Sequence, residues 1–118
     1  MSGIKKTSEI NIRIGLNEQN VPVKIEWKAD DHPNGEGFQE SKAMLISFLD
    51  RETKDTLKMD LWTKDMQVME MDRFFFQTLR AMADTYHRAT QNSDLATDMQ
   101  RFVQYFGEKT EIIPKENS

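Results

Sequence analysis

The apolar residues of this chain change their spacing once, near residue 66, and that change limits the folds open to it. Before it, apolar and polar residues alternate, which is the period of a half-buried β-strand; after it, apolar residues recur every three or four positions, as in an amphipathic α-helix. Strands followed by helices, rather than interleaved with them, are typical of α+β folds. We therefore predict an α+β protein in which a four-stranded antiparallel sheet, made of two hairpins, is followed by two helices packed on one face.

The first predicted hairpin joins two alternating segments. Residues 10–16 alternate isoleucine or leucine with polar residues and glycine, and residues 22–28 alternate in the same way after an initial proline. The segment between them, residues 17–20 (Asn-Glu-Gln-Asn), is typical of a turn. We expect the two segments to pair as antiparallel strands with one apolar face.

The second predicted hairpin joins residues 43–49, which are apolar on both faces, to residues 56–63, which alternate strictly. Residues 50–55 are polar and turn the chain back. Residues 29–41 separate the two hairpins, and they contain turn-forming residues and no periodicity. This segment is therefore predicted to be the longest loop.

Two amphipathic helices are predicted after the strands. The first follows Asp65, which can serve as its N-cap, and ends before Asn92. The second can be capped by Ser93, and Gly107 suits the left-handed conformation that often ends a helix. The apolar stripe of the first helix comprises Val68, Met71, Phe75, Leu79, Met82 and Tyr86, and that of the second comprises Leu95, Met99, Phe102, Val103 and Phe106.

The length of the chain, 118 residues, is that of a single domain. We predict one α+β domain over residues 8–109. Residues 1–7 are polar and are predicted to be a disordered N-terminus, and residues 110–118 are predicted to form a polar tail.

The charge balance and the composition exclude several classes of function. The chain has 16 Lys and Arg against 20 Asp and Glu, and its basic residues are scattered, so we expect no nucleic-acid binding. No segment approaches the ~20 apolar residues of a membrane span, and no apolar segment follows the charged N-terminus as it would in a secretion signal. The chain has no Cys, which excludes disulfides and cysteine-ligated zinc. The expected location is the cytoplasm.

No catalytic or metal-binding motif is recognisable in the sequence. Asp30, Asp31 and His32 bring acids and an imidazole together, but a zinc site needs three or four converging ligands and the chain has only 2 His. Residues 35–37 (Gly-Glu-Gly) lack the third glycine and the Lys-Ser/Thr pair of phosphate-binding loops. We therefore expect no enzymatic activity, no metal site and no cofactor.

The predicted fold has more apolar side chains than one core can receive. Phe74, Phe75 and Phe76 span about 200° around the first helix. One flank of this helix carries Phe76, Met69 and Ala83, and the other carries Phe74. Either of these flanks can rest against the second helix. The other flank then needs the margin of the sheet or a partner.

The outer face of the predicted sheet also carries large apolar residues, and two interpretations remain open. This face can simply be partly apolar, as many protein surfaces are. Alternatively, its apolar residues form a contact patch for self-association or for another protein. The predicted contact patch comprises Leu45, Leu49, Trp62, Met69 and Phe76.

Several short stretches of the chain match a known family in the same order. The most specific is the segment 61–66 (Leu-Trp-Thr-Lys-Asp-Met). The others are residues 8–12, 21–27, 56–60, 75–79, 82–90 and 102–109. From about Ser8 to Lys109, the chain resembles the GldC family of gliding bacteria. That resemblance implies a small accessory protein of gliding motility, a process tied to a secretion apparatus in the cell envelope, with no enzymatic activity, cofactor or catalytic motif.

Two functions are therefore weighed. The first is a cytoplasmic, non-catalytic accessory of gliding motility that acts through protein–protein contacts with unidentified partners of the gliding machinery, with self-association left open. The second comes from another resemblance. Four strands followed by two helices are similar to the export chaperone SecB, a tetramer with an acidic surface, and this similarity implies binding of unfolded or secreted polypeptides.

Overall fold

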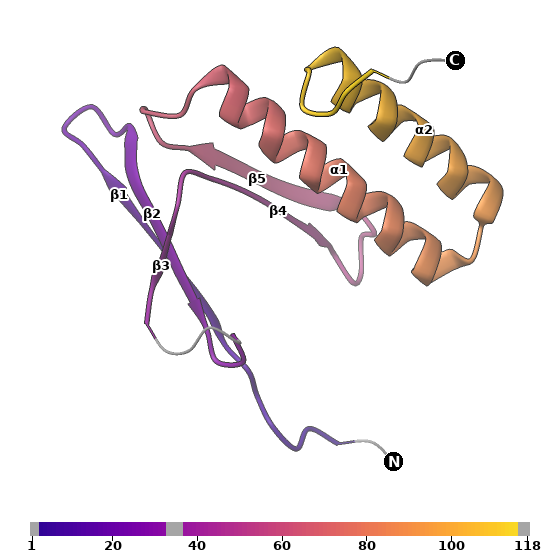
Figure 1. Cartoon of the computed structure of the whole chain (residues 1–118). Helices are drawn as coiled ribbons and strands as arrows, with labels where there is room; N and C mark the ends of the chain where they lie inside the picture. Colours follow the sequence, from indigo (N-terminus) through magenta and orange to yellow (C-terminus); the bar gives the residue numbers. More distant parts are fainter. Residues whose placement is uncertain (1–2, 33–36, 116–118) are drawn as a thin grey trace. The chain divides into compact units, whose positions relative to one another are not determined.

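The computed structural model describes residues 3–32 and 37–115, which form five strands and two helices (Figure 1). They belong to two compact units that divide between Met66 and Gln67, a sheet unit and a helix unit. Parts of the predicted N-terminus, loop and tail fall on residues 1–2, 33–36 and 116–118, outside the described residues. The predicted single domain over residues 8–109 stays a prediction.

The first predicted hairpin is confirmed. It consists of β1 (Ile10–Leu16) and β2 (Pro22–Ala29), which pair antiparallel. Ile14 lies opposite Ile25, so the apolar residues of the two strands share one face. Ile25 is almost completely buried and is the largest side chain with so little exposure among the described residues.

The second predicted hairpin is also confirmed, as β4 (Ala43–Leu49) paired antiparallel with β5 (Thr56–Trp62). Asp50 orders the turn between them, because its Oδ2 accepts hydrogen bonds from the backbone N–H groups of Glu52 at 3.0 Å and Thr53 at 2.9 Å. These bonds favour the charged carboxylate and lower the pKa of Asp50. One face of this hairpin is entirely apolar and consists of Met44, Ile46, Phe48, Leu57, Met59 and Leu61.

The prediction of one four-stranded sheet is wrong, because the hairpins belong to two separate sheets. The predicted loop 29–41 contains a short strand, β3 (Gln39–Ser41), which pairs with β2 and completes a three-stranded sheet. After a bend at Lys42 the chain continues as β4 and pairs with β5 in a two-stranded sheet. An alternating pattern reports which face of a strand is apolar, but it does not report which neighbour the backbone pairs with.

In the helix unit, α1 (Val68–Thr90) and α2 (Ser93–Lys109) run antiparallel side by side (Figure 1). The buried residues of α1 are Phe76 and Ala83, which lie on one side of the helix two turns apart. Those of α2 are Ala96, Val103 and Gly107. Three of these five residues, Ala83, Ala96 and Gly107, are small and leave room for the facing helix.

Gly107 of α2 packs directly against Phe76 of α1 and against Ile113 in the segment after α2. A Cβ atom added there would lie 2.6 Å from Cε1 of Phe76 and 2.8 Å from Cγ1 of Ile113, so only glycine fits without a shift of its neighbours. Gly107 lies inside α2 and not at its end, so its predicted role as a left-handed cap is wrong. The left-handed residue after the helix is Glu111, and the chain folds back so that the N–H of Ile112 bonds to the carbonyl of Gly107 at 2.9 Å.

Both predicted N-caps lie close to the observed ones but are not the capping residues. Helix α1 is capped at Gln67, whose backbone N–H bonds to Oε1 of Glu70 at 2.9 Å. Asp65 instead accepts a hydrogen bond from the hydroxyl of Thr63 at 2.6 Å, which lowers the pKa of this carboxyl. Helix α2 is capped by Asn92, whose side chain accepts from the N–H of Leu95. The predicted packing of the helices on one face of the sheet stays a prediction.

Candidate functional site: an apolar groove along the first helix

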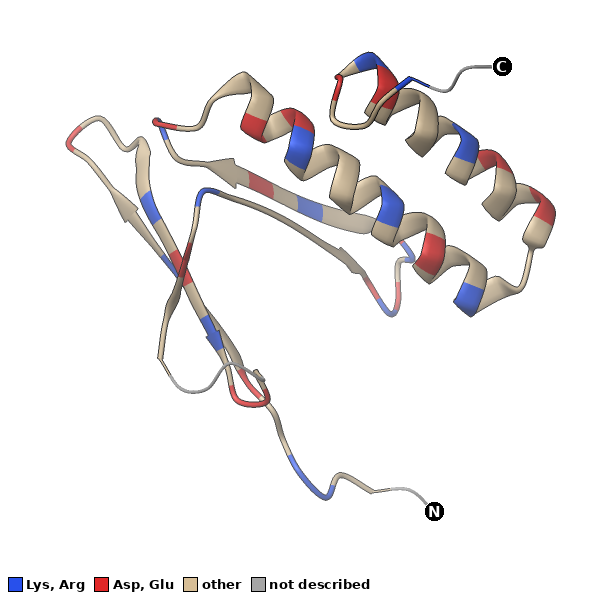
Figure 2. Ribbon diagram, in the orientation of Figure 1, with Lys and Arg blue, Asp and Glu red and all other residues tan. Residues whose placement is uncertain are grey.

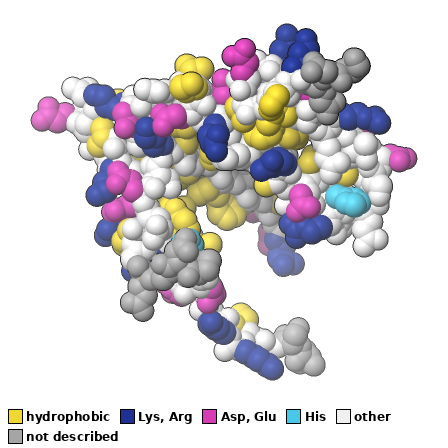
Figure 3. All heavy atoms as spheres, viewed as in Figure 1, with side chains coloured by type: hydrophobic (Ala, Val, Ile, Leu, Met, Phe, Trp, Pro, Cys, Tyr) yellow, Lys and Arg dark blue, Asp and Glu magenta, His cyan; other side chains and the backbone are white. Residues whose placement is uncertain are grey.

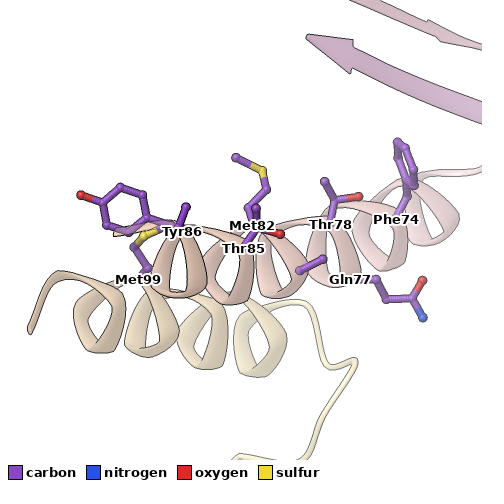
Figure 4. Close-up of a pocket in the computed structure, with 9 residues that line it drawn as sticks. Phe74, Gln77, Thr78, Met82, Thr85, Tyr86 and Met99 are labelled. Atoms are coloured by element: carbon purple, nitrogen blue, oxygen red, sulfur yellow. The ribbon is translucent and has the colours of Figure 1, made fainter. Parts of the chain in front are cut away.

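An apolar groove of about 700 Å³ runs along α1 (Figure 4). Its residues recur every three or four positions, so they form one stripe on the helix surface. Eight of the nine come from α1 and one comes from α2. The lining residues are Phe74, Gln77, Thr78, Ala81, Met82, Thr85, Tyr86, Ala89 and Met99.

The groove is hollow because small residues lie between large ones. Thr78, Ala81, Thr85 and Ala89 have short side chains, whereas aromatic rings and thioethers rise beside them at Phe74, Met82, Tyr86 and Met99. Figure 4 shows the ring of Tyr86 and the thioether of Met99 meeting where α2 passes α1. This arrangement can receive apolar side chains of a ligand, and the hydroxyl and amide groups can orient it.

None of the lining residues is charged, which limits the chemistry of the groove. Its polar groups are threonine and tyrosine hydroxyls and one amide, all of which can donate and accept hydrogen bonds. The ion pair beside it, Arg88 with Asp84 at 3.0 Å, is exposed and neutral overall. The lining is therefore mainly apolar, with a few uncharged groups that can form hydrogen bonds.

The predicted core stripe of α1 is only partly buried in the structure. Within the helix unit the buried side is that of Phe76, which is 6% exposed, whereas Phe75 is 38% exposed, and the predicted place of Phe75 in a core shared with the sheet stays a prediction. Consecutive helical residues point about 100° apart, so burial of Phe76 against α2 turns Phe75 away from it. The apolar stripe of α2 is likewise exposed at Leu95 and Phe102.

The structure places the predicted contact residues in three different settings. Leu45, Leu49 and Trp62 share one face of the β4–β5 hairpin, as the register shows, but Lys58 and Asp60 lie on the same face between them. Leu49 and Trp62 are exposed and Leu45 is half-buried. The three residues share a face without forming a continuous apolar patch.

The two predicted contact residues of α1 differ from each other. Met69 is well exposed. Phe76 is buried in the helix pair, so its prediction as a surface contact residue is wrong. The physical reason is that the flank of Phe76 is the one that rests against α2, which leaves the flank of Phe74 and Thr78 to form the groove.

The groove residues were missed as a site by sequence reasoning, although one signal pointed to them. Three consecutive phenylalanines on a helix cannot all face one neighbouring element. One of the two flanks, that of Phe74 or that of Phe76, must therefore meet a second surface. The sequence does not show which flank α2 would cover. It also does not show that Ala81, Thr85 and Ala89 would leave a hollow there.

Ionisable residues are spread along the described parts of the chain, residues 3–32 and 37–115. No group of three or more His, Asp or Glu residues that could hold a metal ion occurs there. Asp31 accepts hydrogen bonds from Ser8 at 2.7 Å and Lys6 at 3.2 Å, and both lower its pKa. Its neighbour His32 packs edge-on against Trp27. These contacts attach the N-terminal segment and the end of β2 to each other.

Charges of both signs are interspersed on the strands and helices (Figure 2), and apolar side chains reach the surface between them (Figure 3). Neither helix, in the part of the chain that the structure describes, combines the length and apolar character needed to cross a membrane. The molecule is thus an α+β protein whose helix pair carries an uncharged, apolar groove.

The family follows from a comparison of the whole sequence. The family model of the gliding motility-associated GldC-like proteins matches residues 22–112, most of the chain. The chain therefore belongs to the GldC-like family, and its association is with gliding motility. No curated protein and no solved structure matches it significantly.

Proposed function

We propose that this protein is a non-catalytic accessory of gliding motility and of the secretion machinery associated with it, acting through protein–protein contacts in the cytoplasm. Membership of the GldC-like family supports the motility role. The observation that carries the contact role is the uncharged, apolar groove along α1. A groove of this chemistry selects apolar side chains and offers no group for acid–base or metal catalysis.

The dimensions of the groove favour a helical segment of the partner as its occupant. From Phe74 to Ala89 the lining residues cover about four turns of α1, or roughly 22 Å. An amphipathic helix that lays its apolar face into a groove presents side chains at the same three- and four-residue spacing. Its anchors would fit over Thr78 and Thr85, between the walls made by Phe74, Met82 and Tyr86. Met69, Leu49 and Trp62 are proposed as further contact positions outside the groove.

Deletion of the gene from a gliding bacterium tests the proposal. We expect reduced colony spreading, restored when the wild-type chain is supplied from a plasmid. A tagged copy should retain components of the gliding machinery, identified by mass spectrometry. Unchanged spreading together with unchanged levels of motility proteins in the deletion strain would contradict the motility role.

A second candidate function is binding of unfolded or secreted polypeptides, as in SecB. The observation that favours it is the presence of two methionines, Met82 and Met99, in the walls of the groove. Flexible thioethers adapt to many apolar sequences and are common on promiscuous binding surfaces. In an aggregation-suppression assay with a denatured model substrate, a chaperone should lower light scattering at stoichiometric amounts. An unchanged scattering trace would leave only the first function.

A further inference from the structure

The β4–β5 sheet has an open edge along β5. Among the described residues, β5 pairs along its length only with β4, and β2 reaches the end of β5, where the N–H of Lys64 bonds to the carbonyl of Pro22 at 3.1 Å. Two backbone hydrogen bonds at the ends of the β4–β5 pairing show which residues of β5 direct their backbone groups toward β4. They run from Thr63 N–H to Lys42 O and from Asp50 N–H to Asp55 O, both 2.8 Å. The odd-numbered residues of β5 direct their N–H and C=O groups toward β4, so the even-numbered ones, including Lys58 and Asp60, direct theirs toward the open edge.

The sequence of β5 is complementary to itself when it is read in the opposite direction. Around Met59, the residues run apolar, positive, apolar, negative, apolar from Leu57 to Leu61. If two copies of β5 paired antiparallel with Met59 opposite Met59, each Lys58 would lie opposite the partner's Asp60. Leu57 would lie opposite the partner's Leu61 on the other face. Opposite charges and apolar pairs in these positions both stabilise a sheet.

This register is the one that the charges allow. A shift by two residues in one direction places Lys58 opposite the partner's Lys58, and a shift in the other direction places Asp60 opposite the partner's Asp60, and both arrangements are destabilising. A shift by one residue brings outward backbone groups against groups already bonded to β4. In the single chain Lys58 and Asp60 pair with each other along the strand, and both remain exposed.

The sheet also gains from a second copy because two strands alone are only marginally stable in water. Phe48, Leu57 and Met59 belong to its all-apolar face. Pairing through β5 would form a four-stranded sheet with this face continuous across both copies. The open edge of β1 fits less well, because its sheet already has three strands and a register centred on Arg13 would place two arginines opposite each other.

We propose that the edge of β5 is an interface between two copies of this chain, paired antiparallel about Met59 with Lys58 of each copy opposite the partner's Asp60. This interface goes beyond the proposed function, because it does not involve the groove on α1 or any motility component. Its tests use purified protein, so its failure would leave the motility proposal unaffected.

Charge reversal on the full chain tests the interface by sedimentation equilibrium. We expect a dimer for the wild type and a dissociation constant at least roughly tenfold weaker for Lys58→Glu and for Asp60→Lys, because each variant places like charges opposite each other twice. An equimolar mixture of the two variants should dimerise again, since the glutamate at position 58 of one chain then lies opposite the lysine at position 60 of the other, and Asp60 of the first chain lies opposite Lys58 of the second. Arg51→Glu, an exposed charge change in the turn before β5, should leave the dimer unchanged.

A single cysteine tests the register independently, because the chain has no Cys of its own. Met59→Cys should form a disulfide-linked dimer on mild oxidation, since residues on the two-fold axis of an antiparallel pair have Cα atoms about 4.5 Å apart. Leu57→Cys should not, because it lies opposite the partner's Leu61. The proposal is overturned if the wild type is a monomer at all concentrations, or if the single charge variants dimerise like the wild type. It is also overturned if the mixture of variants stays monomeric, or if Leu57→Cys cross-links and Met59→Cys does not. Circular dichroism checks that the charge variants are folded. If one of them is unfolded, the cross-linking of the cysteine variants tests the interface instead.

Discussion

Replacing Phe76 with Ala is expected to lower the free energy of unfolding by about 3–5 kcal/mol, the usual cost of removing a buried phenylalanine. Its ring is 6% exposed and lies against the position where Gly107 leaves room for it. Urea denaturation followed by circular dichroism at 222 nm measures the loss.

Phe102→Ala is the matched control, because it removes the same side chain from the other helix of the pair at a position that is 52% exposed. We expect it to cost about 1 kcal/mol or less, since most of that ring's surface is already in water. Equal losses in the free energy of unfolding for Phe76→Ala and Phe102→Ala would show that the side of α1 turned toward α2 is not the side of Phe76.

Introducing Arg at Thr85 is expected to abolish most of the partner binding proposed for the groove. A guanidinium placed between the walls made by Met82 and Tyr86 would lose water without gaining an opposite charge from the lining residues. We expect binding of the retained motility partner to weaken at least about tenfold, with a matching loss of colony spreading in the complemented deletion strain. Thr85 is exposed and helical, so the variant should fold.

Thr97→Arg provides the control for this experiment. Thr97 is an exposed threonine of α2, and it lies outside the groove on the opposite flank from Met99. The two variants have the same change in charge and the same change in helix-forming tendency. If both variants bind and spread like the wild type, the groove is not the contact surface, and Leu49, Trp62 and Met69 become the positions to test.

The strands and helices could be predicted from the sequence because their periods are local properties. Both hairpins and both helices appear where the alternation and the helical repeat place them. The arrangement of the sheets could not be predicted in the same way. β3 has three residues and no apolar pattern, and what defines it is backbone pairing with β2, to which every residue type contributes equally.

The groove shows a similar limit on one helix. That Phe74, Phe75 and Phe76 could not share a single neighbour followed from 100° of rotation per residue. Which of them became buried depended on Gly107 in α2, since a Cβ atom there would lie 2.6 Å from Cε1 of Phe76. A helical pattern gives the apolar directions of one helix, whereas the choice among them depends on the shape of the other helix.

The bend at Lys42 restricts how the length of this chain can vary among its relatives. One residue separates β3 from β4, and successive side chains of a strand point to opposite faces. An insertion of one residue at the bend would therefore exchange the sides of Met44, Ile46 and Phe48 with those of Leu45, Ser47 and Leu49. An insertion of two residues would restore the original sides. We expect homologous sequences to gain or lose residues at this bend only in even numbers, unless a bulge elsewhere in β4 compensates.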